Sequence, residues 1–175
     1  WQLGQQADWQ PSIALTQLGG CAWARILSRR PEFADRCDWS KLKPLAWRQL
    51  LMRQPQFADK CDWEKLDGWN WGCLLECQPQ FADKCNKWDE FESEDWRVLL
   101  SEQPQFANKC DNWDELDSFG WSWLLSKQPQ FADKCDMWDE FNSKDWSWLL
   151  RDQPQFADKC DWSKLDGGDW SSLLQ

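Results

Sequence analysis

Residues 129–153 read PQFADKCDMWDEFNSKDWSWLLRDQ, and variants of this segment recur along most of the chain. A phenylalanine follows each opening proline by two positions and a cysteine by six, so the register is the same in every copy. The opening prolines lie 24 or 25 residues apart, at Pro31, Pro55, Pro79, Pro104, Pro129 and Pro154. A segment that recurs at a fixed period predicts a repeat protein in which each unit packs mainly against its neighbours.

The second half of each copy has the apolar spacing of a helix. Trp146, Leu149 and Leu150 lie at positions i, i+3 and i+4, and the other copies repeat this pattern. A serine or an aspartate stands three or four residues before the helix tryptophan, where an N-cap is expected. These predicted N-caps are Asp67, Ser93, Ser118, Ser143 and Asp166.

The PQFADKC segment predicts a second helix in each unit. Proline cannot continue the preceding helix, but it is favoured in the first turn of a new one. Phe57, Ala58 and Cys61 then share one helical stripe, whereas a strand would turn Asp59 toward the core. Glutamine precedes most of these prolines and is a poor N-cap, so we expect it only at a tight turn between helices.

These patterns favour an all-α fold, a solenoid of short helices in tandem repeats. The alternative is a leucine-rich-repeat-like solenoid with short strands, because the period also suits that class and Leu66, Trp69 and Trp71 would lie along one strand. The position of Trp69 is however occupied by Glu94 and Lys144 in other units, which argues against a buried strand residue there.

The copies divide the chain into two parts. Residues 31–175 form six repeats, of which the last is truncated, so we expect the array to belong to a longer one. Residues 1–30 form a degenerate N-terminal repeat or cap, in which Trp23, Ile26, Leu27 and Pro31 still match the helical half of the unit.

The LL..QPQFADKCDW unit resembles those of long tandem arrays in uncharacterised bacterial proteins. Its architecture is similar to that of the leucine-rich repeat variant, which is a solenoid of short helices. The resemblance covers the repeats alone and implies a helical stack in a bacterial protein. It implies no activity.

Composition narrows the classes of function. The chain has a formal charge of −10 and a pI near 4.5, which disfavours binding to nucleic acid or to an anionic membrane surface and suits a basic or aromatic partner. It lacks histidine, the commonest general base and metal ligand. Acidic residues such as Asp59 and Asp133 recur in five of the six units, unlike the residues of a single catalytic pocket. We therefore expect no enzyme activity, no cofactor and no membrane span.

Nine cysteines raise the question of redox or metal chemistry. Six occur once per unit, too far apart in a helical stack to bridge, so we expect them to pack as small apolar groups. Cys73 and Cys77 lie at i and i+4, but nothing completes a zinc site around them. The odd total favours a reducing, intracellular compartment.

The recurring tryptophans are expected to form the core. One set follows the cysteine, at Trp39, Trp63, Trp88, Trp113, Trp138 and Trp162. The other set lies on the helix, at Trp47, Trp71, Trp96, Trp121, Trp146 and Trp170. Each buried indole N–H needs a hydrogen-bond acceptor.

The residues two before and two after each helix tryptophan form what we call the variable ridge, because they face away from the Trp–Leu–Leu stripe and change between units. Exposed aromatic side chains beside basic residues are typical of protein interfaces. The predicted partner-binding residues are Trp69, Phe119, Trp123, Trp148, Leu45, Val98 and Lys144. The sequence thus predicts a non-catalytic scaffold that recognises a protein or peptide. A structural element that assembles with further copies of itself is the alternative, and a cysteine-based metal or redox role is a remote one.

Overall fold

A computed structural model describes residues 17–169 of the chain, and within this range every regular element is a helix. The all-α repeat solenoid is therefore confirmed, and the alternative with short strands is wrong for the described residues. The chain divides into two compact units, Trp1–Lys65 and Leu66–Gln175, each of which is considered by itself. Residues 1–16 of the predicted cap and 170–175 of the last repeat lie outside the described residues.

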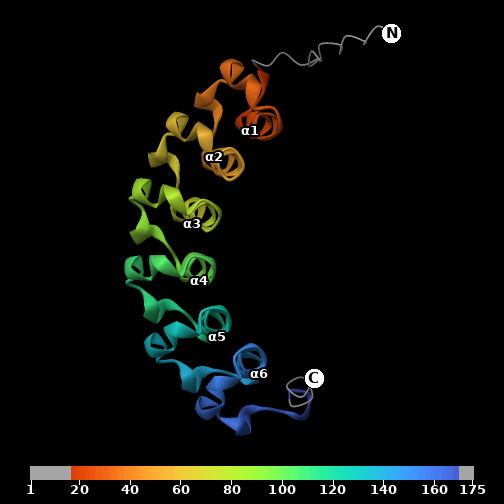
Figure 1. Cartoon of the computed structure of the whole chain (residues 1–175), viewed down its shortest axis with the longest axis vertical. Coiled ribbons are helices and arrows are strands. Elements are labelled where there is room, and N and C mark those ends of the chain that lie inside the picture. The colour runs from red at the N-terminus through yellow and green to blue at the C-terminus, as the bar shows by residue number, and fades with distance from the viewer. Residues whose placement is uncertain (1–16, 170–175) are drawn as a thin grey trace, which may run out of the picture. The chain divides into compact units, whose positions relative to one another are not determined.

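Among residues 17–169, six α-helices carry the Trp–Leu–Leu stripe or, in the first of them, its Trp–Ile–Leu variant, and the buried sides of these helices form the core. They are α1 (Gly20–Arg29) and α2 (Pro44–Leu51) in the first unit, and α3 (Gly68–Cys77), α4 (Ser93–Glu102), α5 (Ser118–Lys127) and α6 (Ser143–Asp152) in the second. Trp121, Leu124 and Leu125 are each 0% exposed. Helix α1 packs on α2 in the first unit, and α3 to α6 pack side by side in one row in the second (Figure 1). No helix among residues 17–169 is long and apolar enough to span a membrane.

The N-caps lie one residue earlier than predicted in three helices. Ser93, Ser118 and Ser143 are the first helical residues, and Glu92, Asp117 and Asn142 are the caps. Side chains with a carboxylate or amide oxygen, four residues before the tryptophan, reach the backbone N–H groups that open the helix. The two predicted aspartate caps are confirmed by bonds of 2.9 Å from the Asn70 N–H to Asp67 and 3.0 Å from the Asp169 N–H to Asp166.

The PQFADK segments are helical as predicted, but they form 3₁₀-helices and end before the cysteine. The backbone N–H of Phe131 bonds to the Gln128 carbonyl at 3.2 Å, and that of Cys135 to Ala132 at 3.3 Å, an i to i+3 pattern. Six residues are too few for a stable α-helix, and the cysteine beyond them is extended. These helices are η2 (Pro31–Arg36), η4 (Pro55–Lys60), η6 (Pro79–Lys84), η8 (Pro104–Lys109), η10 (Pro129–Lys134) and η12 (Pro154–Lys159).

A second short 3₁₀-helix, which the sequence analysis did not predict, begins at each tryptophan that follows the cysteine. Lys87, Asn112 and Met137 are extra residues in three copies and directly precede three of these helices. The set comprises η3 (Trp39–Lys41), η5 (Trp63–Lys65), η7 (Trp88–Glu90), η9 (Trp113–Glu115), η11 (Trp138–Glu140) and η13 (Trp162–Lys164).

These six tryptophans are not core residues, so the prediction was right only for the helix set from Trp47 to Trp146. Trp170 of that set lies outside the described residues. Trp138 is half-buried: its ring stacks on the buried Trp146 with centroids 5.8 Å apart, and it meets Phe156 of the next unit at 5.4 Å. The Lys159 ammonium lies 4.9 Å from the centroid of the Trp138 ring. The ring therefore contacts two neighbouring repeats, and part of it stays exposed to solvent.

The helix tryptophans are buried together with the polar N–H groups of their indole rings. Within residues 17–169, the indole N–H groups of Trp23, Trp47, Trp121 and Trp146 have no hydrogen-bond acceptor, contrary to expectation. Leaving such a group unpaired costs about 1–3 kcal/mol. Burial of the large ring against leucines and the stacked tryptophan outweighs that cost.

The glutamine before the proline has a partner in the preceding unit. The side-chain amide of Gln153 donates to the Ser126 carbonyl oxygen at 2.7 Å, and Gln54 does the same to Ser28 at 3.0 Å. Each of these carbonyls belongs to the last turn of an α-helix, where the backbone has no further helical partner. The glutamine after the proline holds the first in place, as in the 2.8 Å bond from Gln155 to Gln153. We call this arrangement the glutamine clasp.

Candidate binding surface

The variable ridge is exposed or half-buried at every predicted partner-binding position. Lys144 is exposed, and Trp123 and Val98 are half-buried. The large apolar residues are 41% exposed at Leu45, 53% at Trp69, 48% at Phe119 and 43% at Trp148. The geometry expected of the ridge, with both positions facing away from the core, is what the structure has.

Three of the predicted residues come together on α5 and α6. The rings of Phe119 and Trp123 have centroids 6.4 Å apart and are tilted by 44°. Trp123 and Trp148, on neighbouring helices, lie 5.8 Å apart at 53°. Tilted rings at these separations are attractive aromatic pairs. We call Phe119, Trp123 and Trp148 the aromatic cluster; Leu45 lies in the other compact unit, and Trp69 lies on α3.

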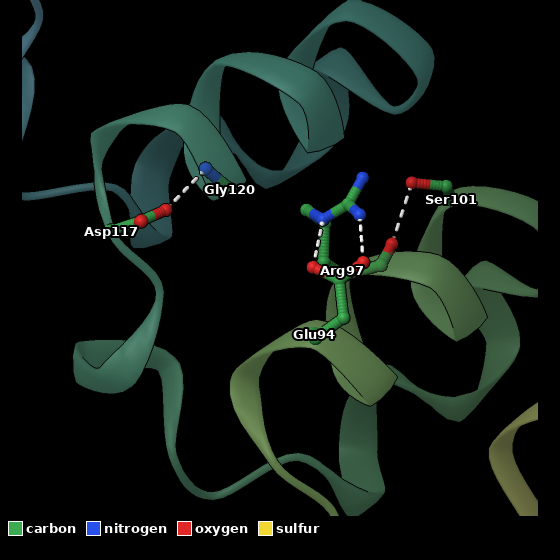
Figure 2. A network of polar contacts seen from close by, with 5 residues as sticks. All are labelled: Glu94, Arg97, Ser101, Asp117 and Gly120. Carbon is green, nitrogen blue, oxygen red and sulfur yellow. Dashed lines mark hydrogen bonds and ion pairs between the residues drawn. The ribbon is translucent and has the colours of Figure 1, made fainter. Parts of the chain in front are cut away.

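Arg97 of α4 extends the aromatic cluster, and the sequence analysis missed it. Its guanidinium carbon lies 5.5 Å from the centroid of Phe119 and 5.2 Å from that of Trp123. Glu94 accepts a hydrogen bond from the Arg97 Nε at 3.0 Å, and Figure 2 shows the guanidinium between α4 and α5. The arginine therefore presents a fixed positive charge to the ring faces.

The stem of Arg97 lies beside a small residue on α5. A Cβ added to Gly120 would lie 3.7 Å from the Arg97 Cδ, so the arginine stem passes directly beside this glycine. The Gly120 N–H is bonded to the Asp117 side chain at 2.7 Å, which sets the start of α5 (Figure 2). Arg97, which follows the helix tryptophan of α4, thus lies beside Gly120, which precedes the helix tryptophan of α5. Ser122 and Asp145 repeat this pairing, with their oxygens 3.4 Å apart.

Arg151 borders the other side of the aromatic cluster. Its guanidinium carbon lies 5.4 Å from the Trp148 ring centroid, and its Nε lies 3.2 Å from an Asp152 oxygen. The signal for both arginines was present in the sequence, since each lies one to three residues from a ridge aromatic or helix tryptophan. The sequence did not show that Arg97 contacts the rings of α5, because this contact depends on how closely neighbouring helices pack.

Trp69 lies beside an acidic cleft at the start of α3 and α4. The cleft has a volume of about 380 Å³ and is lined by Asp67, Gly68, Trp69, Glu90, Glu92, Glu94 and Asp95. Burial raises the pKa of the Asp95 carboxyl, and nearby carboxylates raise it further. A hydrogen bond from the Glu92 N–H opposes this rise in part. The cleft therefore combines negative charge with an exposed indole.

The recurring cysteines lie apart from one another in the described part of the chain, and several of them are buried. None of the nine forms a disulfide, and residues 17–169 contain no group of three or more Cys, Asp or Glu that could hold a metal ion. Burial raises the pKa of Cys61 to about 12 and those of Cys85, Cys110 and Cys135 to about 11. A thiol with so high a pKa is a poor nucleophile and a poor ligand at neutral pH.

Comparisons with known proteins add no name to this geometry. No family model, no curated protein and no solved structure matches the chain. Function must therefore be inferred from the surface itself.

Proposed function

We propose that the chain is a non-catalytic repeat scaffold that recognises a protein or peptide through the variable ridge. The observation that carries this proposal is the aromatic cluster, whose three rings share the exposed side of α5 and α6 with the guanidinium groups of Arg97 and Arg151. Tryptophan and arginine are the residues most enriched at the energetic centres of interfaces.

The contrast between constant and variable positions supports the same proposal. Trp71, Trp96 and Trp121 occupy one position in successive helices and are at most 2% exposed. Two residues before each of them the chain has Trp69, Glu94 and Phe119. The helical stack therefore does not depend on which residue occupies the ridge, and its chemistry is free to suit a partner.

The charge of this compact unit indicates the kind of partner. Residues 66–169 contain 23 Asp and Glu against ten Lys and Arg. The acidic cleft beside Trp69 adds carboxylates next to an exposed ring. A partner segment with aromatic or aliphatic anchors and a lysine or arginine would match both features. We propose a bacterial, intracellular setting on the resemblance of the repeat and the odd number of cysteines.

A display library of random peptides, selected against the wild-type chain, tests the proposal. Enriched peptides are then titrated against Trp123→Ser and Trp148→Ser. We expect each variant to weaken binding by at least about tenfold, as for a central interface aromatic. Trp162→Ser is the matched control, because Trp162 is also 43% exposed but does not lie on the ridge. Equal losses in all three variants, or no enriched peptide at all, would refute recognition through the ridge.

The alternative function is self-assembly, in which further copies cover the ridge. Light scattering over a concentration series distinguishes the two functions. A molar mass of one chain at every concentration supports recognition of another partner. A mass that rises with concentration, and that Trp148→Ser returns to that of one chain, supports self-assembly.

A further inference from the structure

The first compact unit is basic, although the whole chain is acidic. Residues 17–65 contain ten Lys and Arg against six Asp and Glu. Six of the eight arginines in the chain lie between Arg25 and Arg53. The net charge of −10 therefore conceals a positively charged region.

Four of these arginines line one cleft between α1 and α2. The cleft has a volume of about 690 Å³, and no Asp or Glu lines it. Its basic residues are Arg25, Arg29, Arg48 and Arg53. Ala24, which is 1% exposed, and Ser28 are the small residues that α1 contributes to the lining. Clefts of about 300–1,000 Å³ are typical of binding sites.

Three of the cleft arginines have no acidic partner. Within residues 17–169, Arg25, Arg29 and Arg53 make no salt bridge. Arg30 and Arg151, which lie outside the cleft, pair with Glu32 and Asp152. In a chain so rich in carboxylates, three unpaired guanidinium groups around one cleft leave their binding capacity for a ligand.

The fold itself does not require these arginines. A basic residue in the last turn of a helix is favoured by the helix dipole, which would be a sufficient reason for Arg29 alone. However, the positions equivalent to Arg29 and Arg53 in the other four helices are occupied by Cys77, Glu102, Lys127 and Asp152. Three of those helices are present with a neutral or acidic residue at this position, so helix formation does not require an arginine there.

We propose that this cleft binds a run of carboxylates in an acidic peptide segment of a partner protein. Guanidinium groups bind carboxylate oxygens through paired hydrogen bonds, and several of them suit several neighbouring acidic side chains. A long phosphodiester chain such as RNA would meet long-range repulsion from the acidic remainder of the protein. A short acidic peptide carries fewer negative charges than such a chain and would meet less repulsion. The inference rests on the proposed function, because Arg25 belongs to the same variable ridge.

Titration calorimetry at low salt with a synthetic oligoglutamate peptide tests this proposal. The key variant is Arg29→Gln with Arg53→Gln, and Arg25→Gln with Arg53→Gln is a second pair should the first not fold. The matched control is Arg36→Gln with Lys43→Gln, which removes the same charge from the same unit outside the cleft. We expect at least about a tenfold loss of affinity for the cleft variants and less than about a twofold loss for the control.

The inference would be overturned if oligoglutamate did not bind the wild type, if the losses were equal in cleft and control variants, or if an RNA oligonucleotide of equal charge bound more tightly. Inorganic phosphate that binds as tightly as the peptide would also overturn it, because the site would then take a single oxyanion. The peptide selection with Trp148→Ser reports on α5 and α6 alone, so either proposal can fail without the other.

Discussion

The side-chain amide of Gln128 donates a hydrogen bond of 2.7 Å to the backbone carbonyl oxygen of Ser101, 27 residues earlier. Ser101 lies in the last turn of α4, so one unit completes the hydrogen bonding of the helix before it. Gln130 in turn donates to the Gln128 Oε1 at 2.8 Å, which turns the Gln128 amide toward α4. In the first repeat Arg30 and Glu32 occupy the two glutamine positions and form an ion pair instead.

Gln128→Glu should destabilise the fold by about 1–3 kcal/mol, because the change replaces the donor by a carboxylate and leaves a helix carbonyl unpaired. Urea denaturation followed by far-UV circular dichroism measures the effect. Gln49→Glu is the control: it makes the same charge change at an exposed side chain outside the clasp, and we expect a loss of about 0.5 kcal/mol or less. Equal losses would show that the clasp contributes little.

Two tryptophans on α6 should differ sharply in their effect on stability. Trp146→Ala removes a ring that is 0% exposed and should cost about 3–5 kcal/mol. Trp148→Ala removes a ring that is 43% exposed and should cost less than about 1 kcal/mol. The midpoints of chemical denaturation provide the comparison, and a large loss for Trp148→Ala would place that residue in the core.

The recurring cysteines should react slowly with iodoacetamide at pH 8. The pKa of Cys85 is raised to about 11, so roughly one molecule in a thousand carries the reactive thiolate at that pH. The rate should rise about tenfold per pH unit until the pH approaches that pKa. Peptide mass spectrometry after short pulses resolves each site, and the exposed Cys21 should be modified first. Equal rates for Cys85 and Cys21 at pH 8 would contradict the burial of Cys85.

Asp95→Asn should make the protein less sensitive to pH. Because burial raises the pKa of Asp95 in the folded chain, the folded state holds this proton more tightly than the unfolded state does. The contribution of Asp95 to the free energy of unfolding therefore falls as the pH rises above its ordinary pKa of 3.8. Asparagine keeps an acceptor for the Glu92 N–H without the buried charge, and Asn70 already occupies the same position in α3.

The variant should therefore gain stability relative to the wild type at pH 7, and this gain should disappear near pH 3. Thermal denaturation at a series of pH values measures it. Asp133→Asn makes the same charge change at an exposed site and serves as the control. A loss of stability at pH 7 in Asp95→Asn alone would mean that the charge itself stabilises the start of α4.

The sequence predicted the structure well where the spacing of apolar residues reflects which side of a helix is buried. The stripe of Trp121, Leu124 and Leu125 predicted the helix and its core side, and the ridge followed from the same geometry. Periodicity says little about partial burial, so Trp138 was assigned to the core although only part of its ring is covered. It also cannot distinguish α from 3₁₀ turns in a six-residue segment such as Pro129–Lys134.

Contacts between units were the harder part. The partner of Gln128 lies 27 residues away and is a backbone carbonyl, which no side-chain pattern indicates. Arg97 contacts the rings of the next helix, and a contact between helices cannot be derived from the spacing of residues within one repeat. The cleft of Arg29 and Arg53 was hidden because the charge was taken over the whole chain rather than within one compact unit.

The glutamine clasp has a consequence for how such an array can change over generations. Gln54, Gln103, Gln128 and Gln153 make the same joint with the helix before them, so one junction is interchangeable with another. Recombination between two copies of the gene segment would delete or duplicate one unit and still leave two ends that fit. One recombination event can then change the order of the ridge residues, and the contacts between neighbouring repeats stay the same.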